Sequence, residues 1–353
     1  PSKAFAEVWD ESGGVVKTVR AVPHTDVIAT LWAELCVLFG LQATYADLVA
    51  SMLGAAAFLS DACGVVAGSR VALLAQNSMA YLAVSLGAMC AGGVSLNLNW
   101  RQPAATTLQL LEGIRPRALC TSAQHEAESQ SHASRLAGLM VVSIDNQCPF
   151  ESLPLTHPAS ARFIARAESP DGATAIAAIF FTGGTTGVPK AVPHTHASLL
   201  WLSEALLRFY PEPFEVPNAA TLCFTPYFHV MGFVANLVFN LHARCRTLLL
   251  ASPTATLSPL LILRATADLR PNVINTVPFI VEGLVALIEE GASIRGESAQ
   301  TILSRLDLLT YGGGPLPPHC PPVLAAAGVL LCCTYGQTEL AGPVLFGRPG
   351  CDA

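Results

Sequence analysis

Apolar residues along this chain form short runs that alternate with segments of helical periodicity. In the first half, short runs typical of buried strands are separated by segments whose apolar residues recur at helical spacing. The predicted strands lie at 71–75, 94–98, 118–121 and 139–144, and the predicted helices at 45–59, 79–90 and 103–114. Strands and helices that alternate in this way favour a parallel sheet covered by helices.

The second half repeats the alternation after a connection at 147–171 that shows little periodicity. Strands are predicted at 175–181, 221–224, 246–251, 273–276, 306–310 and 329–333, with helices at 197–209 and after Pro278. The sequence thus predicts an α/β protein with two subdomains, residues 1–165 and 166–353. The apolar run at 30–41 is interpreted as a helix.

Composition tests whether the apolar runs belong to a membrane protein. Hydrophobic residues make up 52% of the chain and charged residues 12%, against about 25% charged in typical soluble proteins. Segments 71–100 and 216–243 contain no charged residue, but Asn, Gln, Gly and Pro interrupt them. We therefore expect buried strands and helices rather than a transmembrane span. The net charge of -6 gives no reason to expect a nucleic-acid partner.

Cysteine usage indicates the compartment. The eleven cysteines are scattered, with no C-x-x-C and no spacing typical of zinc ligands. Free thiols in a reducing compartment are expected. The chain starts at Pro1 without a signal-peptide pattern. These features favour a cytoplasmic protein, and peripheral membrane association stays open.

A segment rich in Gly and Thr, residues 182–190, follows the predicted strand at 175–181 and reads T-G-G-T-T-G-V-P-K. Glycines let backbone N–H groups approach a ligand, threonines add hydroxyl groups, and Lys190 adds a positive charge. The segment therefore predicts a polyphosphate site. It is not a Walker A motif, because Val188 and Pro189 separate Gly187 from the lysine. Loops 225–232, 311–316 and 334–339 also follow predicted strands, where open α/β sheets bind ligands.

Two of these segments carry a family resemblance. Residues 182–190 resemble the phosphate-binding signature of the adenylate-forming superfamily, which includes acyl-CoA synthetases, coumarate–CoA ligases, luciferases and peptide-synthetase adenylation domains. The segment T-Y-G-Q-T-E at 334–339 is similar to the second signature of that superfamily, and P-Y-F-H-V-M-G lies between them at 226–232. The resemblance covers roughly residues 44 to 350. It implies the N-terminal large domain of these enzymes, with two helix-covered, mostly parallel sheets in a layered arrangement.

The resemblance implies activation of a carboxylic acid by ATP and Mg²⁺ to an acyl-adenylate, followed by transfer to CoA. Fatty-acid metabolism is one setting that this implies. The candidate ATP-binding residues are Thr182, Gly183, Gly184, Thr185, Thr186, Gly187, Lys190, Gly312, Gly313, Gly314, Pro315, Thr334, Tyr335, Gly336 and Thr338. Tyr335 would stack on adenine, Thr338 would donate to the α-phosphate, and Glu339 would bind Mg²⁺. Alternatively, Glu339 is a solvated carboxylate, Tyr335 a core aromatic residue and 312–314 a plain turn.

His229 completes the implied catalytic set of His229, Lys190, Thr338 and Glu339. Relatives place a His beside the acyl carbonyl and the thiol entrance, although an isolated His is often a hydrogen-bonded core residue. Since His229 offers no fixed negative charge to pair with an ammonium group, a plain carboxylic acid is favoured over an amino acid. The implied acyl pocket is apolar, favours a fatty or aryl acid, and is lined by His229, Met231, Phe233, Thr276, Phe279, Ile280, Gly312, Gly314 and Leu340. His194 and His196 are interpreted as helix-cap or surface residues.

The sequence departs from the family pattern at three places. Gly183 and Ala191 replace a usual Ser and Gly. After the segment 347–350, no counterpart of the ribose-binding Asp, the hinge or the mobile C-terminal domain with its catalytic Lys follows. We therefore expect a truncated large domain. The alternatives are a catalytically incompetent nucleotide- or acyl-binding remnant, and an adenylation domain that loads a carrier-protein thiol instead of CoA.

Overall fold

The computed structural model describes residues 36–38, 41–144, 150–167, 170–183, 187–209, 219–250 and 258–347. The chain divides into two compact units, each built around one sheet. The six-stranded unit comprises residues 46–201 and 226–230, and the eight-stranded unit comprises residues 1–45, 202–225 and 231–353.

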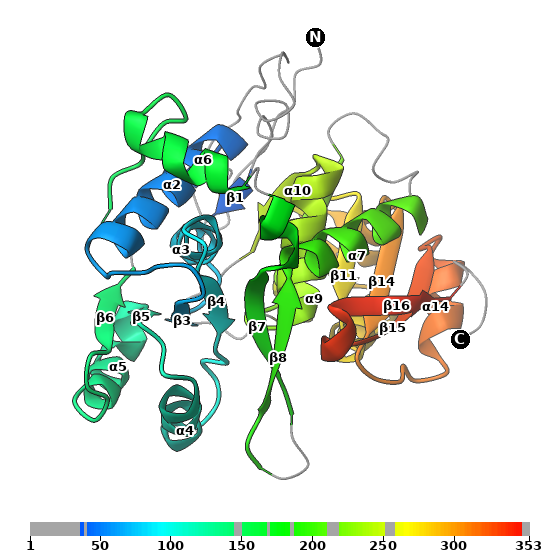
Figure 1. Cartoon of the computed structure of the whole chain (residues 1–353). Coiled ribbons are helices and arrows are strands. Elements are labelled where there is room, and N and C mark those ends of the chain that lie inside the picture. Colours follow the sequence, from blue (N-terminus) through cyan, green and yellow to red (C-terminus); the bar gives the residue numbers. More distant parts are fainter. Residues whose placement is uncertain are drawn as a thin grey trace. The chain divides into compact units, whose positions relative to one another are not determined.

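The six-stranded unit contains a sheet in the order β6-β5-β3-β4-β7-β8. Every neighbouring pair is parallel except β7 and β8, which form a long antiparallel hairpin (Figure 1). The strands are β3 (Arg70–Leu74), β4 (Val94–Asn97), β5 (Ala118–Thr121), β6 (Met140–Ser143), β7 (Ile176–Thr182) and β8 (Lys190–Thr195). The short apolar runs of β3, β4 and β5 are buried, as in Leu96 and Leu119, because helices cover the parallel strands.

Helices in this unit begin and end where the sequence supplies caps. The hydroxyl of Ser78 accepts the N–H of Tyr81 at 3.0 Å and starts α3. Arg115 adopts a left-handed conformation before Pro116 and ends α4. The helices are α2 (Tyr45–Asp61), α3 (Met79–Cys90), α4 (Ala104–Ile114), α5 (Glu126–Ala133) and α6 (Ala161–Ala167), with short 3₁₀ turns η1 (Ala123–His125), η2 (Pro158–Ser160) and η3 (Pro170–Thr174).

The eight-stranded unit contains a sheet in the order β16-β15-β14-β11-β9-β10-β1-β2. Its central pairs are parallel, and the edge strands β2 and β16 are antiparallel to their neighbours. The strands are β1 (Cys36–Leu38), β2 (Leu41–Ala43), β9 (Ala220–Cys223), β10 (Arg246–Leu249), β11 (Val273–Thr276), β14 (Leu308–Gly312), β15 (Leu331–Gln337) and β16 (Gly342–Phe346), with a separate hairpin β12 (Ser293–Ile294) and β13 (Glu297–Ser298).

Helices flank this sheet as well (Figure 1). They are α7 (His196–Phe209), α9 (Val230–Gly232), the π-helix η4 (Phe233–Val238), α10 (Phe239–Ala243), α11 (Pro259–Leu269), α12 (Pro278–Glu289), α13 (Ala299–Leu303) and α14 (Cys320–Ala326), with the 3₁₀ turn η5 (Thr338–Leu340). Apolar residues of α11, α12 and α13 pack on β9, β11 and β14, among them the fully buried Ile274 and Leu284. The α/β fold class predicted from the sequence, with two mostly parallel, helix-flanked sheets, is confirmed.

Three local expectations differ from the structure. Within the apolar run 30–41, Cys36–Leu38 form β1, which pairs with β10, so the predicted helix is wrong there. The strand at 175–181, assigned by sequence to the subdomain beginning at 166, pairs with β4 in the six-stranded sheet. A strand's own residues do not specify its neighbour. His194 is 4% exposed because β8 pairs with β7 and turns it inward against Phe180, so it is not a surface residue.

Helix α3 approaches α2 closely at Gly87, where a Cβ would lie 2.8 Å from both the Cβ of Ala55 and the carbonyl oxygen of Met52. We expect Gly87→Ala to lower the free energy of unfolding by about 1–3 kcal/mol through overpacking. Gly113→Ala in α4, where a Cβ meets nothing within 4 Å, should raise it by about 0.5–1 kcal/mol. Urea unfolding of both variants checks the sign, and equal shifts would contradict the close approach.

Candidate functional site

The Gly- and Thr-rich segment connects the two strands of the β7–β8 hairpin. Thr182 ends β7, Lys190 begins β8, and the two are direct cross-strand partners. Their Cβ atoms are therefore neighbours, at a typical separation of about 5 Å. Gly187 has a φ of 95°, which favours glycine. Gly183, Gly187 and Lys190 are exposed, whereas residues 184–186 lie outside the described part.

The turn that carries His229 is anchored by aromatic residues within the six-stranded unit. The backbone N–H of Tyr227 donates to Asn77 Oδ1 at 2.8 Å. The Tyr227 ring is fully buried, with its centroid 5.7 Å from that of Tyr81. Phe228 meets Trp100 edge-on at 6.5 Å. These contacts hold the turn from one side.

His229 itself closes this turn, because its N–H donates to the carbonyl of Pro226 at 3.1 Å. Part of its surface is exposed, yet loss of solvation lowers the pKa of His229 below its usual value near 6.5. The imidazole is therefore neutral at physiological pH. A neutral ring at this position provides one hydrogen-bond donor and one acceptor and no fixed charge.

Within the eight-stranded unit, the carboxyl ends of β11, β14 and β15 bring predicted site residues together. Thr276 lies beside Tyr311, and Gly312 lies beside Thr334 in the parallel ladder. A Cβ at Gly312 would lie 2.6 Å from Thr334 Oγ1, 2.7 Å from its carbonyl oxygen and 3.6 Å from Met231 Cε. Only glycine fits there, so the backbone of Gly312 and the Met231 side chain are held close.

Thr276 has an unusual environment at this edge. Thr276 is 1% exposed, and within the described part of the chain its Oγ1 forms no hydrogen bond. A buried hydroxyl without a partner costs about 1–3 kcal/mol. A ligand or water that bonds to this oxygen would recover that free energy.

The remaining predicted pocket residues differ in exposure. Phe233 and Ile280 are buried in the packing of the unit, at 0% and 4% exposed. Phe279, by contrast, is 65% exposed at the start of α12. Gly314 lies against this start, because a Cβ there would be 3.7 Å from Pro278 Cγ. Leu340, in η5, is exposed.

The second signature runs from β15 into η5. The ladder between β15 and β16 shifts register between Tyr335 and Gly336. A Cβ at Gly336 would lie 2.4 Å from the carbonyl oxygen of Gly342, so the bulge requires glycine. Tyr335 is exposed, and its hydroxyl accepts a hydrogen bond from Gln337 Nε2 at 2.6 Å. The alternative that Tyr335 is a core aromatic residue is therefore wrong.

Glu339 and Thr338 occupy the turn η5 after this bulge. Glu339 is exposed, whereas Thr338 is 9% exposed. Within the described residues, no group of three His, Cys, Asp or Glu side chains could hold a metal ion. A single exposed carboxylate still suits Mg²⁺, which commonly takes one or two protein carboxylates plus phosphate oxygens and water.

A chain of buried amides behind this edge was missed by sequence reasoning. Asn236, in the π-helix η4, donates to Thr225 Oγ1 at 2.7 Å and to the Met231 carbonyl at 3.1 Å. Its Oδ1 accepts from Asn275 at 2.8 Å, and Asn275 accepts from Thr310 at 2.6 Å. The chain ties β11 and β14 to both ends of the loop that carries His229. Asn236 within an otherwise apolar segment was the available signal.

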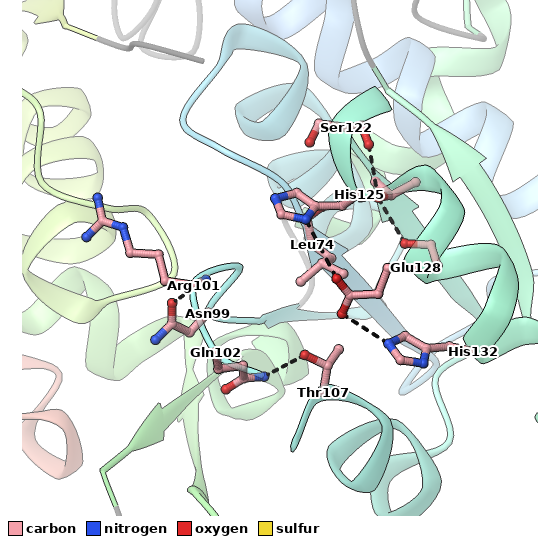
Figure 2. Close-up of polar contacts among 11 residues, drawn as sticks. Leu74, Asn99, Arg101, Gln102, Thr107, Ser122, His125, Glu128 and His132 are labelled. Carbon is pink, nitrogen blue, oxygen red and sulfur yellow. Dashed lines mark hydrogen bonds and ion pairs between the residues drawn. The ribbon is translucent and has the colours of Figure 1, made fainter. Parts of the chain in front are cut away.

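A second polar cluster, also missed, lies at the carboxyl ends of β4 and β5 in the six-stranded unit (Figure 2). Glu128 lies between His125 and His132, at 3.8 Å and 3.1 Å. Asn99 Oδ1 accepts the backbone N–H of Arg101 at 2.9 Å, and the Arg101 guanidinium lies 4.7 Å from the Trp100 ring centroid. The carboxyl edge of this sheet therefore carries its own polar side chains.

Comparison with known families decides the affiliation. The family model "AMP-binding enzyme" matches residues 22–353. The chain belongs to the AMP-binding enzyme family. The family resemblance deduced from the two signature segments is thereby confirmed. The contribution of each site residue stays a prediction.

Curated relatives of this AMP-binding chain are acyl-CoA ligases and longer proteins. Feruloyl-CoA synthase of Amycolatopsis sp is 28% identical over 94% of this chain and 60% of its own length. 4-Coumarate–CoA ligase 3 of Arabidopsis thaliana is 26% identical over 80% of this chain and 48% of its own length. Naringenin synthase of Pestalotiopsis fici is 26% identical over 88% of this chain and 11% of its own length. The chain thus spans at most three fifths of these relatives.

Solved structures support the fold. Apo MatB from Rhodopseudomonas palustris superposes with a TM-score of 0.70 at 22% identity, covering 89% of this chain and 58% of that one. The N-terminal domain of FACL13 from Mycobacterium tuberculosis gives 0.67 at 21% identity, covering 85% and 70%. In the part of the chain that the structure describes, no helix has the length and apolar content to cross a bilayer. The eight cysteines whose side chains are described are free thiols, as predicted.

The hydrogen bond between Asn236 and Asn275 predicts that substitutions at these two residues have coupled effects on the free energy of unfolding. Asn236→Leu should lower the free energy of unfolding by about 2–4 kcal/mol, because it removes the hydrogen bonds that the buried Asn236 side chain forms with Thr225, the Met231 carbonyl and Asn275. Asn275→Leu alone should also destabilise. The double variant should cost less than the sum, with a coupling of about 0.5–3 kcal/mol. Additive free energies in a denaturant double-mutant cycle would refute the linked arrangement.

Proposed function

We propose that this chain forms the adenylation part of an enzyme that activates a carboxylic acid with ATP. A carboxylate oxygen attacks the α-phosphorus, the bond from phosphorus to the pyrophosphate oxygen breaks, and pyrophosphate leaves. The resulting acyl-adenylate then reacts with a thiol. The sulfur forms a bond to the acyl carbon, and the carbon–oxygen bond to AMP breaks.

The observation that carries this proposal is the carboxyl edge formed by β11, β14 and β15. There Gly312, which has no side chain, lies beside Thr334 and the methyl group of Met231. The buried Thr276 hydroxyl at the same edge forms no hydrogen bond within the described residues. This edge continues into the exposed residues Gly313 and Gly314. An exposed glycine backbone beside one orphan hydroxyl suits a flat or apolar ligand that makes few polar contacts.

The reaction brings two anions together, so the protein must offset their charge. Thr182, Lys190 and the backbone N–H groups of the hairpin loop would hold the β- and γ-phosphates. Thr338 would donate to the α-phosphate. Mg²⁺, held by Glu339 and phosphate oxygens, would supply further positive charge at the leaving pyrophosphate.

Substrate preference follows from the charge of the proposed acyl site. His229 is neutral at physiological pH because its pKa is lowered, and none of the other pocket residues is ionisable. A neutral, mainly apolar set favours a fatty or aryl acid over an amino acid. Relatives named feruloyl-CoA synthase and 4-coumarate–CoA ligase support an aryl acid, and one named long-chain-fatty-acid–AMP ligase supports a fatty acid.

The acceptor thiol is CoA in this proposal, as the names of the CoA-ligase relatives suggest. A carrier-protein thiol is the second candidate. It is favoured by the similarity to longer proteins, of which the chain covers 11% and 26%. Incubation with acid, ATP and either CoA or a phosphopantetheinylated carrier protein distinguishes them by which thioester forms.

Exchange of labelled pyrophosphate into ATP, measured across ferulate, 4-coumarate, benzoate, octanoate, palmitate and leucine, tests the activation step. We expect exchange with an aryl or fatty acid and none with leucine. Lys190→Ala should reduce it by about 10²-fold, as for loss of one charge-stabilising donor. Arg162→Ala removes an exposed cation of the same unit and should have no effect.

The outcome of this experiment separates the enzyme from a remnant. If the full-length protein supported no exchange with any acid, and Lys190→Ala left ATP binding unchanged, the enzyme proposal would fail. ATP binding without exchange would favour a nucleotide-binding remnant instead.

Thr276→Val tests the orphan hydroxyl. Because that oxygen has no partner in the described chain, its removal should leave the free energy of unfolding unchanged or raise it by up to about 1 kcal/mol. If substrate uses the hydroxyl, kcat/KM for the acid should fall about threefold to tenfold. Thr266→Val is the matched control, since its buried hydroxyl already donates to the Ile262 carbonyl at 2.8 Å. It should lose stability and keep kcat/KM, and the reverse pattern would contradict the assignment.

A further inference from the structure

Two aromatic residues directly precede His229, and their side chains contact different parts of the six-stranded unit. The ring of Tyr227 is fully buried, with Tyr81 of α3 beside it. The ring of Phe228 is only partly buried and meets Trp100 edge-on, with the ring centroids 6.5 Å apart and the planes at 84°. All of these residues belong to one compact unit. The turn that carries His229 is therefore held through two rings.

The chain on both sides of Trp100 is fixed by hydrogen bonds. Asn99 Oδ1 accepts the backbone N–H of Arg101 at 2.9 Å (Figure 2). The backbone N–H of Gln102 donates to the Asn99 carbonyl at 3.1 Å, and Gln102 Nε2 donates to Thr107 Oγ1 of α4 at 3.1 Å. The segment after β4 thus forms a closed turn that is tied to α4, and the indole projects from this turn.

The indole of Trp100 has neighbours from three segments of the unit. The Arg101 guanidinium lies 4.7 Å from its ring centroid. The His125 ring, in η1, lies at 6.0 Å with its plane tilted by 45°. Phe228, from the turn of His229, is the third neighbour. A cation over an aromatic ring and an edge-on pair of rings are both attractive arrangements, so these contacts restrict the orientation of the indole.

We propose that Trp100 is a positioning residue for His229 and acts through Phe228. Phe228 and His229 share one planar peptide unit, and the His229 N–H closes the turn on the Pro226 carbonyl at 3.1 Å. A displacement of the Phe228 ring therefore displaces the imidazole. In the proposed function, on which this inference rests, that imidazole lies beside the acyl carbonyl. A misplacement of about 1 Å in such a site can lower the rate about 10²-fold.

NMR titration of the histidines tests the contact without relying on activity. Trp100→Ala removes the indole beside Phe228, so water should reach the turn and the pKa of His229 should rise toward its usual value near 6.5. Trp100→Phe keeps an aromatic ring and should keep most of the lowering. His229→Gln assigns the signal. Trp201→Ala is the matched control, because Trp201 is 66% exposed in the same unit, and it should leave this pKa unchanged.

Phe228→Leu removes the other ring of the pair and should raise the pKa of His229 in the same way. The test therefore stands even if Trp100→Ala does not fold. An unchanged pKa in the folded Trp100 and Phe228 variants would overturn the proposal, and so would an equal rise in Trp201→Ala.

Steady-state thioester formation supplies the second readout. Trp100→Ala should lower kcat about tenfold to a hundredfold and leave the KM for ATP unchanged, because the proposed phosphate-binding residues lie outside this turn. Trp100→Phe should recover most of kcat. A normal kcat in Trp100→Ala would overturn the positioning role. If the wild-type protein activated no acid, the proposed function would fail, whereas the NMR titration would still decide whether Trp100 controls the surroundings of His229.

Discussion

The hydrogen bond between the half-buried amide of Asn275 and the buried amide of Asn236 is the constraint on which the eight-stranded edge depends. A side-chain amide in an apolar interior must place both its donors and its acceptor, so it permits few positions for its neighbours. The π-helix that carries Asn236 has a wider turn than an α-helix, and such turns are frequent at functional sites. Through this pair, β11 and β14 are linked by hydrogen bonds to Thr225 and Met231.

Glycines at the strand ends allow further close contacts at this edge of the sheet. Gly312 allows β14 to lie against the Thr334 side chain and carbonyl oxygen, and Gly336 allows β15 to approach Gly342. At Gly336, which is exposed, the backbone rather than a side chain presents the surface at the edge. A backbone surface keeps its shape when surrounding side chains vary, which fits a family whose members take different acids on one fold.

The sequence predicts the parts of this molecule that depend on local pattern. Strand–helix alternation, the end of the helix predicted at 103–114, and the loops after strands follow from periodicity and turn chemistry. The pairing of strands that are distant in sequence does not follow from local pattern. The pairing of β7 with β4 and of β1 with β10 joins strands that are distant in sequence, and nothing in the three residues of Cys36–Leu38 specifies a strand over a helix.

The candidate site residues also differ in whether the sequence alone identifies them. The residues at 182–190 and 334–339 are found from sequence because glycine, threonine and lysine are unusual together. Asn275 escapes notice because it is an ordinary residue inside a strand. Its importance arises from its partner Asn236, which only the folded chain brings near.

The β7–β8 hairpin has a consequence for how this chain tolerates change in length. Thr182 and Lys190 face each other across an antiparallel ladder, so the side on which the lysine emerges is set by the pairing register. Alternate residues of a strand point to opposite faces, and a slip of one residue would turn Lys190 to the other face of the sheet. A one-residue insertion that is absorbed by the ladder would move the charge, whereas one absorbed by the loop would not. The pairing register of the hairpin thus determines the face on which Lys190 lies. Substitutions between Thr182 and Lys190 keep that register, whereas insertions or deletions can change it.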